Sequence, residues 1–143
     1  MSDADWQFMS VASNDLTTLP TDTATTFTNT FPVPMMFQSN NVQVALFSLS
    51  YFLATGGKNT FFLNTSLVAG LQIIGSDVTN SVRLFTLTDG SGTWEPQRLQ
   101  WLDAVTSGGA ISLVQVTITD IAGADAVDLT GPNLATFVFR ELE

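Results

Sequence analysis

Residues 112–120 read SLVQVTITD and residues 134–140 read LATFVFR, and these two runs decide the fold class. In the first run, valine, valine and isoleucine alternate with polar residues, which is the period of two that gives a β-strand one apolar face. In the second run, Phe137 and Phe139 alternate with residues of other kinds. We therefore predict two strands that turn an apolar face to a core, and a chain that ends inside a sheet.

The rest of the chain divides into similar short segments. Turn-rich stretches separate apolar runs at the spacing of all-β sandwiches, and the count is about eight to ten strands. Residues 66–74 fit a short helix as well as a strand, and the DGSG run at 89–92 is predicted to be a turn because glycine tolerates positive φ. The expected fold is all-β, a single jelly roll (a two-sheet antiparallel β-sandwich), with a closed barrel as the second possibility. The other strands are expected over 27–37, 42–52, 60–65, 80–88 and 97–102.

Two strand positions can be predicted in more detail. Pro32 and Pro34 cannot donate to a strand ladder, so the segment that contains them is expected at a sheet edge or a bend. The run from 42 to 52 is the longest strand-like stretch, and such a stretch is typical of a central strand.

The length of 143 residues suits one domain. Residues 1–26 are rich in Asp and Thr and are predicted to be a flexible N-terminal arm, with the jelly-roll domain over 27–143. The aromatic cluster at 6–9 allows two interpretations, a solvated terminus or an arm that docks on a neighbour. On this division, deleting residues 1–26 leaves the domain folded.

The composition excludes several classes of function. Four basic residues against 13 acidic ones give a net charge of −9, so direct nucleic-acid binding is not expected. Histidine and cysteine are absent, which removes Ser-His-Asp and Cys-His catalysis, zinc sites of those ligands and disulfides. We expect no enzyme activity, no cofactor and no membrane span. Charged residues are 12% of the chain against 45% hydrophobic ones, which favours an assembly over a free monomer.

Three weak candidates for chemistry remain. Asp120, Asp125 and Asp128 could supply oxygen ligands to a hard cation, but turn aspartates more often bond their own backbone, so no metal site is assigned. Glu95 and Asp103, beside Trp94 and Trp101, superficially suggest a glycosidase pair, but both tryptophans are more often core or interface residues. The run 56–58, GGK, lacks the earlier glycine and the following Ser or Thr of a phosphate loop.

Three residues are the candidate interface. Trp6 and Phe8 are aromatic anchors in the predicted arm, and Arg140 is a guanidinium on the last predicted strand. Arg140 is expected either to pair with a carboxylate, which could belong to a neighbouring subunit, or to be a solvated edge charge.

The order of these segments resembles the single jelly-roll penton (vertex) proteins of double-stranded DNA viruses of the double-jelly-roll lineage, including virophages and polinton-like viruses. The resemblance spans residues 27–140 loosely, and it rests on the order of five runs: FTNTFPVP (27–34), VQVALFSLSY (42–51), WLDAV (101–105), VTITDIAG (116–123) and LATFVFR (134–140). The chain departs from the family in leaving no room for an insertion domain, and in having Phe137 to Phe139 where the tail strand often carries a histidine.

The resemblance implies a virion structural protein, a homopentamer at the five-fold vertices whose N-terminal arm faces the neighbouring major capsid proteins. Another minor capsid or spike-base role stays open. The alternative is a receptor- or carbohydrate-binding spike or fibre head that uses Trp94 and the loop 89–92. A small calcium-dependent hydrolase that depends on Asp120 ranks last.

Overall fold

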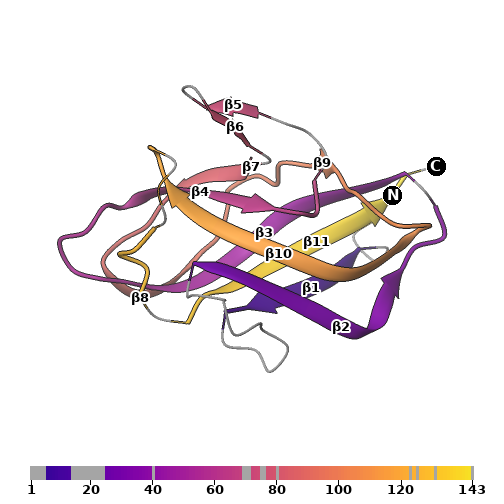
Figure 1. Cartoon of the computed structure of the whole chain (residues 1–143), viewed down its shortest axis with the longest axis horizontal. Coiled ribbons are helices and arrows are strands. Elements are labelled where there is room, and N and C mark those ends of the chain that lie inside the picture. The colour runs from indigo at the N-terminus through magenta and orange to yellow at the C-terminus, as the bar shows by residue number, and fades with distance from the viewer. Residues whose placement is uncertain are drawn as a thin grey trace.

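Two antiparallel sheets pack face to face in this computed structural model (Figure 1). The structure describes residues 6–13, 25–39, 41–68, 72–74, 77–79, 81–122, 124, 126–130 and 132–142. The strands in this part of the chain are β1 (Gln7–Ala12), β2 (Thr26–Met36), β3 (Val42–Leu53), β4 (Thr60–Thr65), β5 (Gln72–Ile74), β6 (Asp77–Thr79), β7 (Ser81–Thr86), β8 (Gly90–Trp94), β9 (Leu102–Asp103), β10 (Ala110–Asp120) and β11 (Leu134–Glu141).

The strand order is that of a jelly roll. One sheet has the order β1-β11-β3-β8 and is called the β1 sheet below, and the other has the order β2-β10-β4-β7 and is called the β2 sheet. If these eight strands are lettered B to I along the chain, the orders become B-I-D-G and C-H-E-F, two interlocked Greek keys. Strand β9 pairs with the start of β3, and β5 and β6 form a separate hairpin. The expected all-β sandwich is confirmed.

The core lies between the two sheets and follows the alternation in the sequence. Val114, Val116 and Ile118 of β10 are fully buried, and so are Phe137 and Phe139 of β11. Burial of each such side chain contributes about 1.5–3 kcal/mol. The predicted inner faces of both strands are therefore confirmed, and β11 lies between β1 and β3, so the chain does end inside a sheet.

The positions expected for the proline segment and for the longest strand are also confirmed. Strand β2 is an edge strand, and its residues 31–34 have no partners on β10 because the pairing jumps from Leu113 opposite Thr30 to Ile111 opposite Met35. Pro32 and Pro34 lie in this unpaired stretch, where a missing N–H costs nothing. Strand β3 is central, with β11 on one side and β8 and β9 on the other.

The predicted flexible arm needs a correction. Residues 7–12 form β1, whose six residues pair with β11, from Gln7 opposite Phe139 to Ala12 opposite Leu134. Met9 and Val11 are buried in the core, so this part of the expected arm is a strand of the sandwich. The domain boundary at residue 26 is therefore wrong for residues 7–12. Residues 1–5 and 14–24 of the expected arm lie outside the described residues.

Two other predicted segments differ from the structure. The expected turn at 89–92 is largely the strand β8, which begins at Gly90. The expected strand at 97–102 is paired only at its end, where β9 begins at Leu102. Arg83 contacts the segment instead, since its Nη1 donates to the carbonyl oxygen of Arg98 at 3.2 Å and to Oε1 of Gln100 at 3.4 Å. Of the ambiguous segment 66–74, residues 72–74 form strand β5.

A glycine in β8 has a packing role that a turn glycine would not have. A Cβ atom on Gly92 would lie 2.8 Å from Oη and 3.1 Å from Cζ of Tyr51, which is buried on the neighbouring strand. Gly92→Ala is therefore expected to lower the free energy of unfolding by about 1–3 kcal/mol through overpacking. Urea denaturation measures the change. The control is Ser91→Ala on the same strand, where the side chain is exposed and the expected change is within about 0.5 kcal/mol.

The described part of the chain holds no helix that is long and apolar enough to cross a membrane.

Candidate interaction surface

The three predicted interface residues lie together on the outer face of the β1 sheet. Phe8 of β1 is opposite Val138 of β11, and Arg140 follows two residues later on the same face. Trp6 lies one residue before β1, at the level of Arg140. These residues were predicted from their side-chain types alone, and the strand register places them together at one end of one sheet face.

Arg140 is held by an amide and an indole. Its Nε and Nη2 donate to Oε1 of Gln43 at 2.9 and 2.7 Å, because Arg140 and Gln43 are register partners on β11 and β3. Its guanidinium carbon lies 4.2 Å from the ring centroid of Trp101, a cation–π distance. Trp6 meets Trp101 edge to face, with ring centroids 5.5 Å apart. Within this chain, Arg140 therefore has a neutral amide partner and is stacked on Trp101, so it is not a solvated edge charge. The expected pairing with a carboxylate of a neighbouring subunit stays a prediction.

Phe8 lies over the neighbouring residues of this face, Val138 and Ala45. Its ring meets that of Phe47 at 5.1 Å and 85°, and below the pair Val138 and Ala45 are completely buried although they point away from the core. Phe8 itself stays 51% exposed. The outer face therefore has a thin aromatic layer of its own, which leaves a half-exposed phenyl ring at its surface.

Further along the same face, hydroxyl groups satisfy one another. Ser10 and Thr136 are 3.0 Å apart across β1 and β11, and Ser50 and Thr93 are 3.4 Å apart across β3 and β8. Mutually bonded hydroxyls lose fewer bonds to water when a surface is covered. This reduces the cost of dehydrating the face.

The outer faces of the two sheets carry few charged side chains. Among the described side chains, the outer face of the β1 sheet carries charge only at Arg140 and Asp103, both at one end. The outer face of the β2 sheet carries none in the described part, where it consists of residues such as Thr30, Leu84, Thr86, Gln115 and Thr117. In a chain of net charge −9, one uncharged face and one face with charge at a single end are a surface property that solubility alone does not require.

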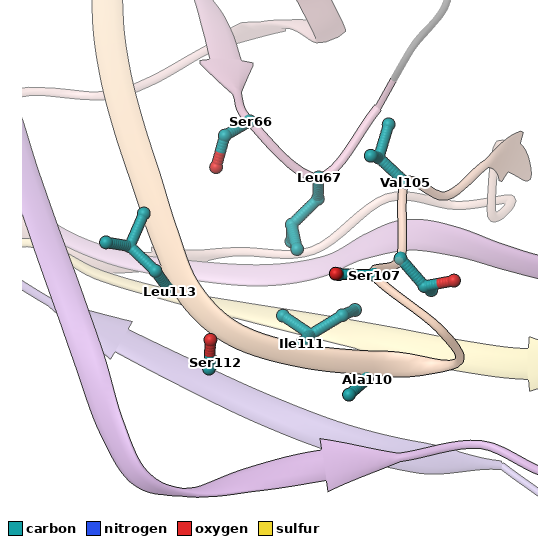
Figure 2. A pocket seen from close by; sticks show the side chains of 9 residues that line it. Ser66, Leu67, Val105, Ser107, Ala110, Ile111, Ser112 and Leu113 are labelled. Carbon is teal, nitrogen blue, oxygen red and sulfur yellow. The ribbon is translucent and has the colours of Figure 1, made fainter.

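A pocket of about 230 Å³ lies beside the first half of β10 (Figure 2). Strand β4 pairs with β10 only over Val116 to Asp120, so on that side residues 110–113 are bordered by two loop segments in place of a strand. Leu67 and Ile111 are the buried part of the lining, and Val105 and Leu113 are its half-exposed part. None of the lining residues is charged; the others are Ser66, Thr106, Ser107, Ala110 and Ser112.

The aspartates considered for a metal organise loops at the opposite end of the sandwich. Asp120 Oδ1 accepts from the backbone N–H groups of Ala122 and Ala124 at 2.9 and 3.1 Å, and Oδ2 pairs with Lys58 Nζ at 2.9 Å. Asp128 Oδ2 accepts from the backbone N–H of Lys58. The side-chain hydrogen bond from Lys58 lowers the pKa of Asp120 despite its burial, and the same bond raises the pKa of Lys58. Asp125 lies outside the described residues, and the described ones contain no group of three or more potential ligands positioned to hold a metal ion.

The structure does not bring the suggested glycosidase pair together. Asp103 is opposite Gln43 at the start of β3, whereas Glu95 follows Trp94, which is opposite Leu49. At about 3.3 Å per residue, their backbones are about 16 Å apart along β3. The ring of Trp94 packs on the buried Phe85, so this tryptophan contacts the core as expected.

Comparison with protein-family models, curated proteins and solved structures finds no match to this chain.

Sequence reasoning missed three parts of this surface. Phe47 is the extra residue of a bulge in β3, and alternation along the strand gives no sign of its outward position. Gln43 becomes the partner of Arg140 only through the register of β3 and β11. The pocket depends on how far β4 runs beside β10, which the sequence does not reveal.

Arg140→Lys tests the stacked cluster. Lysine keeps the charge but cannot donate in parallel to Gln43 or lie flat on Trp101, so we expect the free energy of unfolding to fall by about 1–2 kcal/mol. The tryptophan emission spectrum is expected to shift as well, because Trp101 loses its cover. Arg98→Lys, on an exposed loop residue, is the control and is expected to change neither. An unchanged spectrum for Arg140→Lys would contradict the assignment.

Proposed function

We propose that this chain is a structural protein of a virus particle: a penton, or vertex, subunit of an icosahedral capsid that forms a homopentamer and docks on neighbouring major capsid proteins. The observation that supports the proposal best is the low charge of the two outer sheet faces of a strongly acidic jelly roll. Among the described side chains, the strands of the β2 sheet carry no charge on their outer face, and the strands of the β1 sheet carry only Arg140 and Asp103, both at one end. Away from that end, such faces can come together without burying an unpaired charge, which is costly at an interface.

The outer faces of the two sheets differ in composition. A closed ring of identical subunits uses a heterologous contact, in which one surface of each copy meets a different surface of the next copy. The aromatic outer face of the β1 sheet and the threonine-rich outer face of the β2 sheet supply two such surfaces on opposite sides of one domain. The jelly-roll strand order and the resemblance of the sequence to penton proteins agree with this role.

The carbohydrate-binding alternative has less support. Its key residue, Trp94, is packed against Phe85, and the guanidinium of Arg83 lies 5.7 Å from its ring centroid. The ring faces the core side of β8, which leaves less of it for a sugar to stack on.

Native mass spectrometry of the purified protein tests the self-assembly, and proteomics of purified virions tests the location. We expect a pentamer and the presence of the chain in particles. Thr136→Glu puts a charge at the middle of the β1-sheet face and is expected to give a folded monomer. Thr55→Glu, on an exposed loop, is the matched control and is expected to keep the pentamer. A wild-type monomer that is missing from particles would refute the proposal.

A further inference from the structure

Asp89 lies at a bend between β7 and β8, where the chain passes from the β2 sheet to the β1 sheet. Asp89 is exposed, and the next residue, Gly90, is the first residue of β8. When glycine follows aspartate, the aspartate carboxyl group can react with the backbone nitrogen of the glycine, because no side chain crowds that nitrogen. The sequence contains this pair once, and it contains no asparagine that is followed by glycine.

The space beside Gly90 is open. Its φ of +94° lies in the left-handed region, which residues with a side chain rarely adopt. A Cβ atom built on Gly90 would have no heavy atom within 4 Å, apart from its chain neighbours. On Gly92, in contrast, a Cβ atom would lie 2.8 Å from Oη of Tyr51. Packing around Gly90 therefore leaves room for the bend to change shape.

The carboxyl group of Asp89 is held less firmly than those of two other loop aspartates. Among the described residues, it accepts one hydrogen bond, from the backbone N–H of Gly56 to Oδ2 at 3.3 Å, which is long for such a bond. Asp120 accepts three hydrogen bonds, of 2.9, 2.9 and 3.1 Å, and Asp128 accepts one of 2.9 Å. A single long bond leaves the Asp89 side chain able to rotate toward the nitrogen of Gly90.

Only the end of the β3–β8 ladder has to open for the two groups to meet. Gly90 pairs with Leu53, and this is the terminal pair, since the other β8 partners of β3 run from Ser91 to Trp94. The terminal pair of a ladder opens at a lower free-energy cost than the interior pairs. The reaction can therefore start from the folded protein without global unfolding.

We propose that Asp89 is a modification site, at which the folded protein isomerises slowly from aspartate to isoaspartate. The backbone nitrogen of Gly90 attacks Cγ of the protonated Asp89 side chain. The bond between Cγ and the hydroxyl oxygen breaks, and the hydroxyl leaves as water with the proton of the nitrogen. The product is a cyclic imide. Neither this step nor the next depends on the proposed self-assembly.

Water then opens the imide at one of its two carbonyl carbons. Attack at Cγ restores aspartate. Attack at the main-chain carbonyl carbon of Asp89 gives isoaspartate, in which the main chain runs through Cβ and Cγ and the former main-chain carbonyl becomes a free carboxylate. One water is lost and one is gained, so the mass of the chain does not change.

The other described aspartates are followed by residues that have a side chain. Asp77, Asp103, Asp120 and Asp128 are followed by Val78, Ala104, Ile121 and Leu129. A side chain at this position crowds the nitrogen that has to attack. The nitrogen of Ala104 is also engaged, because its N–H donates to the carbonyl oxygen of Val42 at 2.9 Å. The isomer is therefore expected at Asp89 ahead of the others.

Isomerisation is expected to loosen the start of β8. Isoaspartate lengthens the main chain by one carbon atom directly before Gly90, whose partner Leu53 is completely buried. The carboxyl group also leaves its place beside the N–H of Gly56. Close packing of Gly92 on Tyr51 gives β8 little freedom to slide and absorb the extra atom. Unfolding of the isomerised protein is therefore expected to shift to lower urea concentration.

Peptide mapping of the full chain tests the site. Cleavage after Arg83 and Arg98 gives the peptide 84–98, in which Asp89 is the one aspartate. After several weeks in native buffer at neutral pH, we expect a second form of this peptide, with the same mass and a different retention time. Fragmentation of the peptide backbone identifies it as the isoaspartate form. The peptides 59–83 and 99–140, which hold the other described aspartates, are internal controls.

Asp89→Glu is the matched variant, because it keeps the carboxylate but requires a larger ring that closes far less readily. We expect the second form of the peptide to be lost in this variant, and the urea midpoint to fall with age in the wild type alone. The synthetic peptide 84–98, incubated in parallel, shows the reaction without the fold. A wild-type chain that stays unchanged while the free peptide isomerises would show that the fold protects Asp89, and would overturn the inference. Equal isomerisation in the peptides 59–83 or 99–140 would overturn the choice of site.

Discussion

Deleting residues 1–13 is expected to leave a chain that no longer folds stably. The deletion removes β1 and with it the buried side chains of Met9 and Val11, which together contribute about 3–6 kcal/mol. The deletion also removes two hydrogen-bond partners of the buried Asn29. Its Oδ1 accepts from the backbone N–H of Ala12 and its Nδ2 donates to the carbonyl oxygen of Ala12, each at 3.0 Å. Two buried polar groups left without partners add about 1–3 kcal/mol each.

The sum is comparable with the whole stability of a typical domain, which is about 5–15 kcal/mol. Circular dichroism and urea denaturation of the truncated protein measure the effect. Deletion of residues 1–5, which keeps Trp6 and all of β1, is the control and is expected to keep the unfolding midpoint. A truncated protein with the wild-type midpoint would mean that β1 is dispensable and that the domain does begin near residue 27, as its composition suggested.

The strands that could be predicted are those whose signal is local. Strands β10 and β11 alternate apolar and other residues over enough positions to identify the buried face. Strand β1 has only six residues between polar stretches, and its ladder partners are about 126 residues away, as for Ser10 and Thr136. No local pattern reveals a pairing over that distance, so the composition of the flanking residues led to the prediction of an arm.

The glycines of residues 89–92 show a second limit of predicting structure from neighbouring residues in the sequence. Two glycines within the DGSG run predict a turn. Gly92 is nevertheless required by a neighbour in space, because the hydroxyl of Tyr51 occupies the place of a side chain. A glycine selected for packing looks the same in a sequence as a glycine selected for its backbone.

The sequence allowed the residues of the candidate surface to be predicted, but not the residues that they contact. Trp6 and Phe8 are predicted as anchors because they are aromatic residues within a polar terminal segment, and Arg140 because a guanidinium on a sheet of an acidic protein normally pairs with a carboxylate. Their neighbours Trp101, Gln43 and Phe47 come from two other segments of the chain and meet them through register and a bulge. Where the charged side chains lie on each sheet face could also be known only after the two faces of each strand were assigned.

Asp120→Ala is expected to lower the free energy of unfolding by about 2–3 kcal/mol, because it leaves the N–H groups of Ala122 and Ala124 without their acceptor. The ion pair with Lys58 adds less, since the lysine side chain is 65% exposed against 7% for Asp120. Lys58→Met is therefore expected to lower the free energy of unfolding much less than Asp120→Ala does, and the loss for Asp120→Asn, which keeps an acceptor oxygen, should lie between the two. Equal losses for all three variants would mean that the ion pair, and not the loop hydrogen bonds, stabilises this end of the sandwich.

The pH dependence separates these contributions further. The pKa of Asp120 is lowered from its ordinary value of 3.8, chiefly by the hydrogen bond from Lys58, so the folded state binds this proton less readily than the unfolded state. Its contribution to stability is therefore fully present above the ordinary pKa and is lost as the pH falls through the lowered pKa. The difference in unfolding free energy between the wild type and Asp120→Asn should be largest near neutral pH and shrink below about pH 4. Urea denaturation of both proteins at several pH values measures it, and a difference that grows with acidity would show that the carboxylate is not the stabilising form.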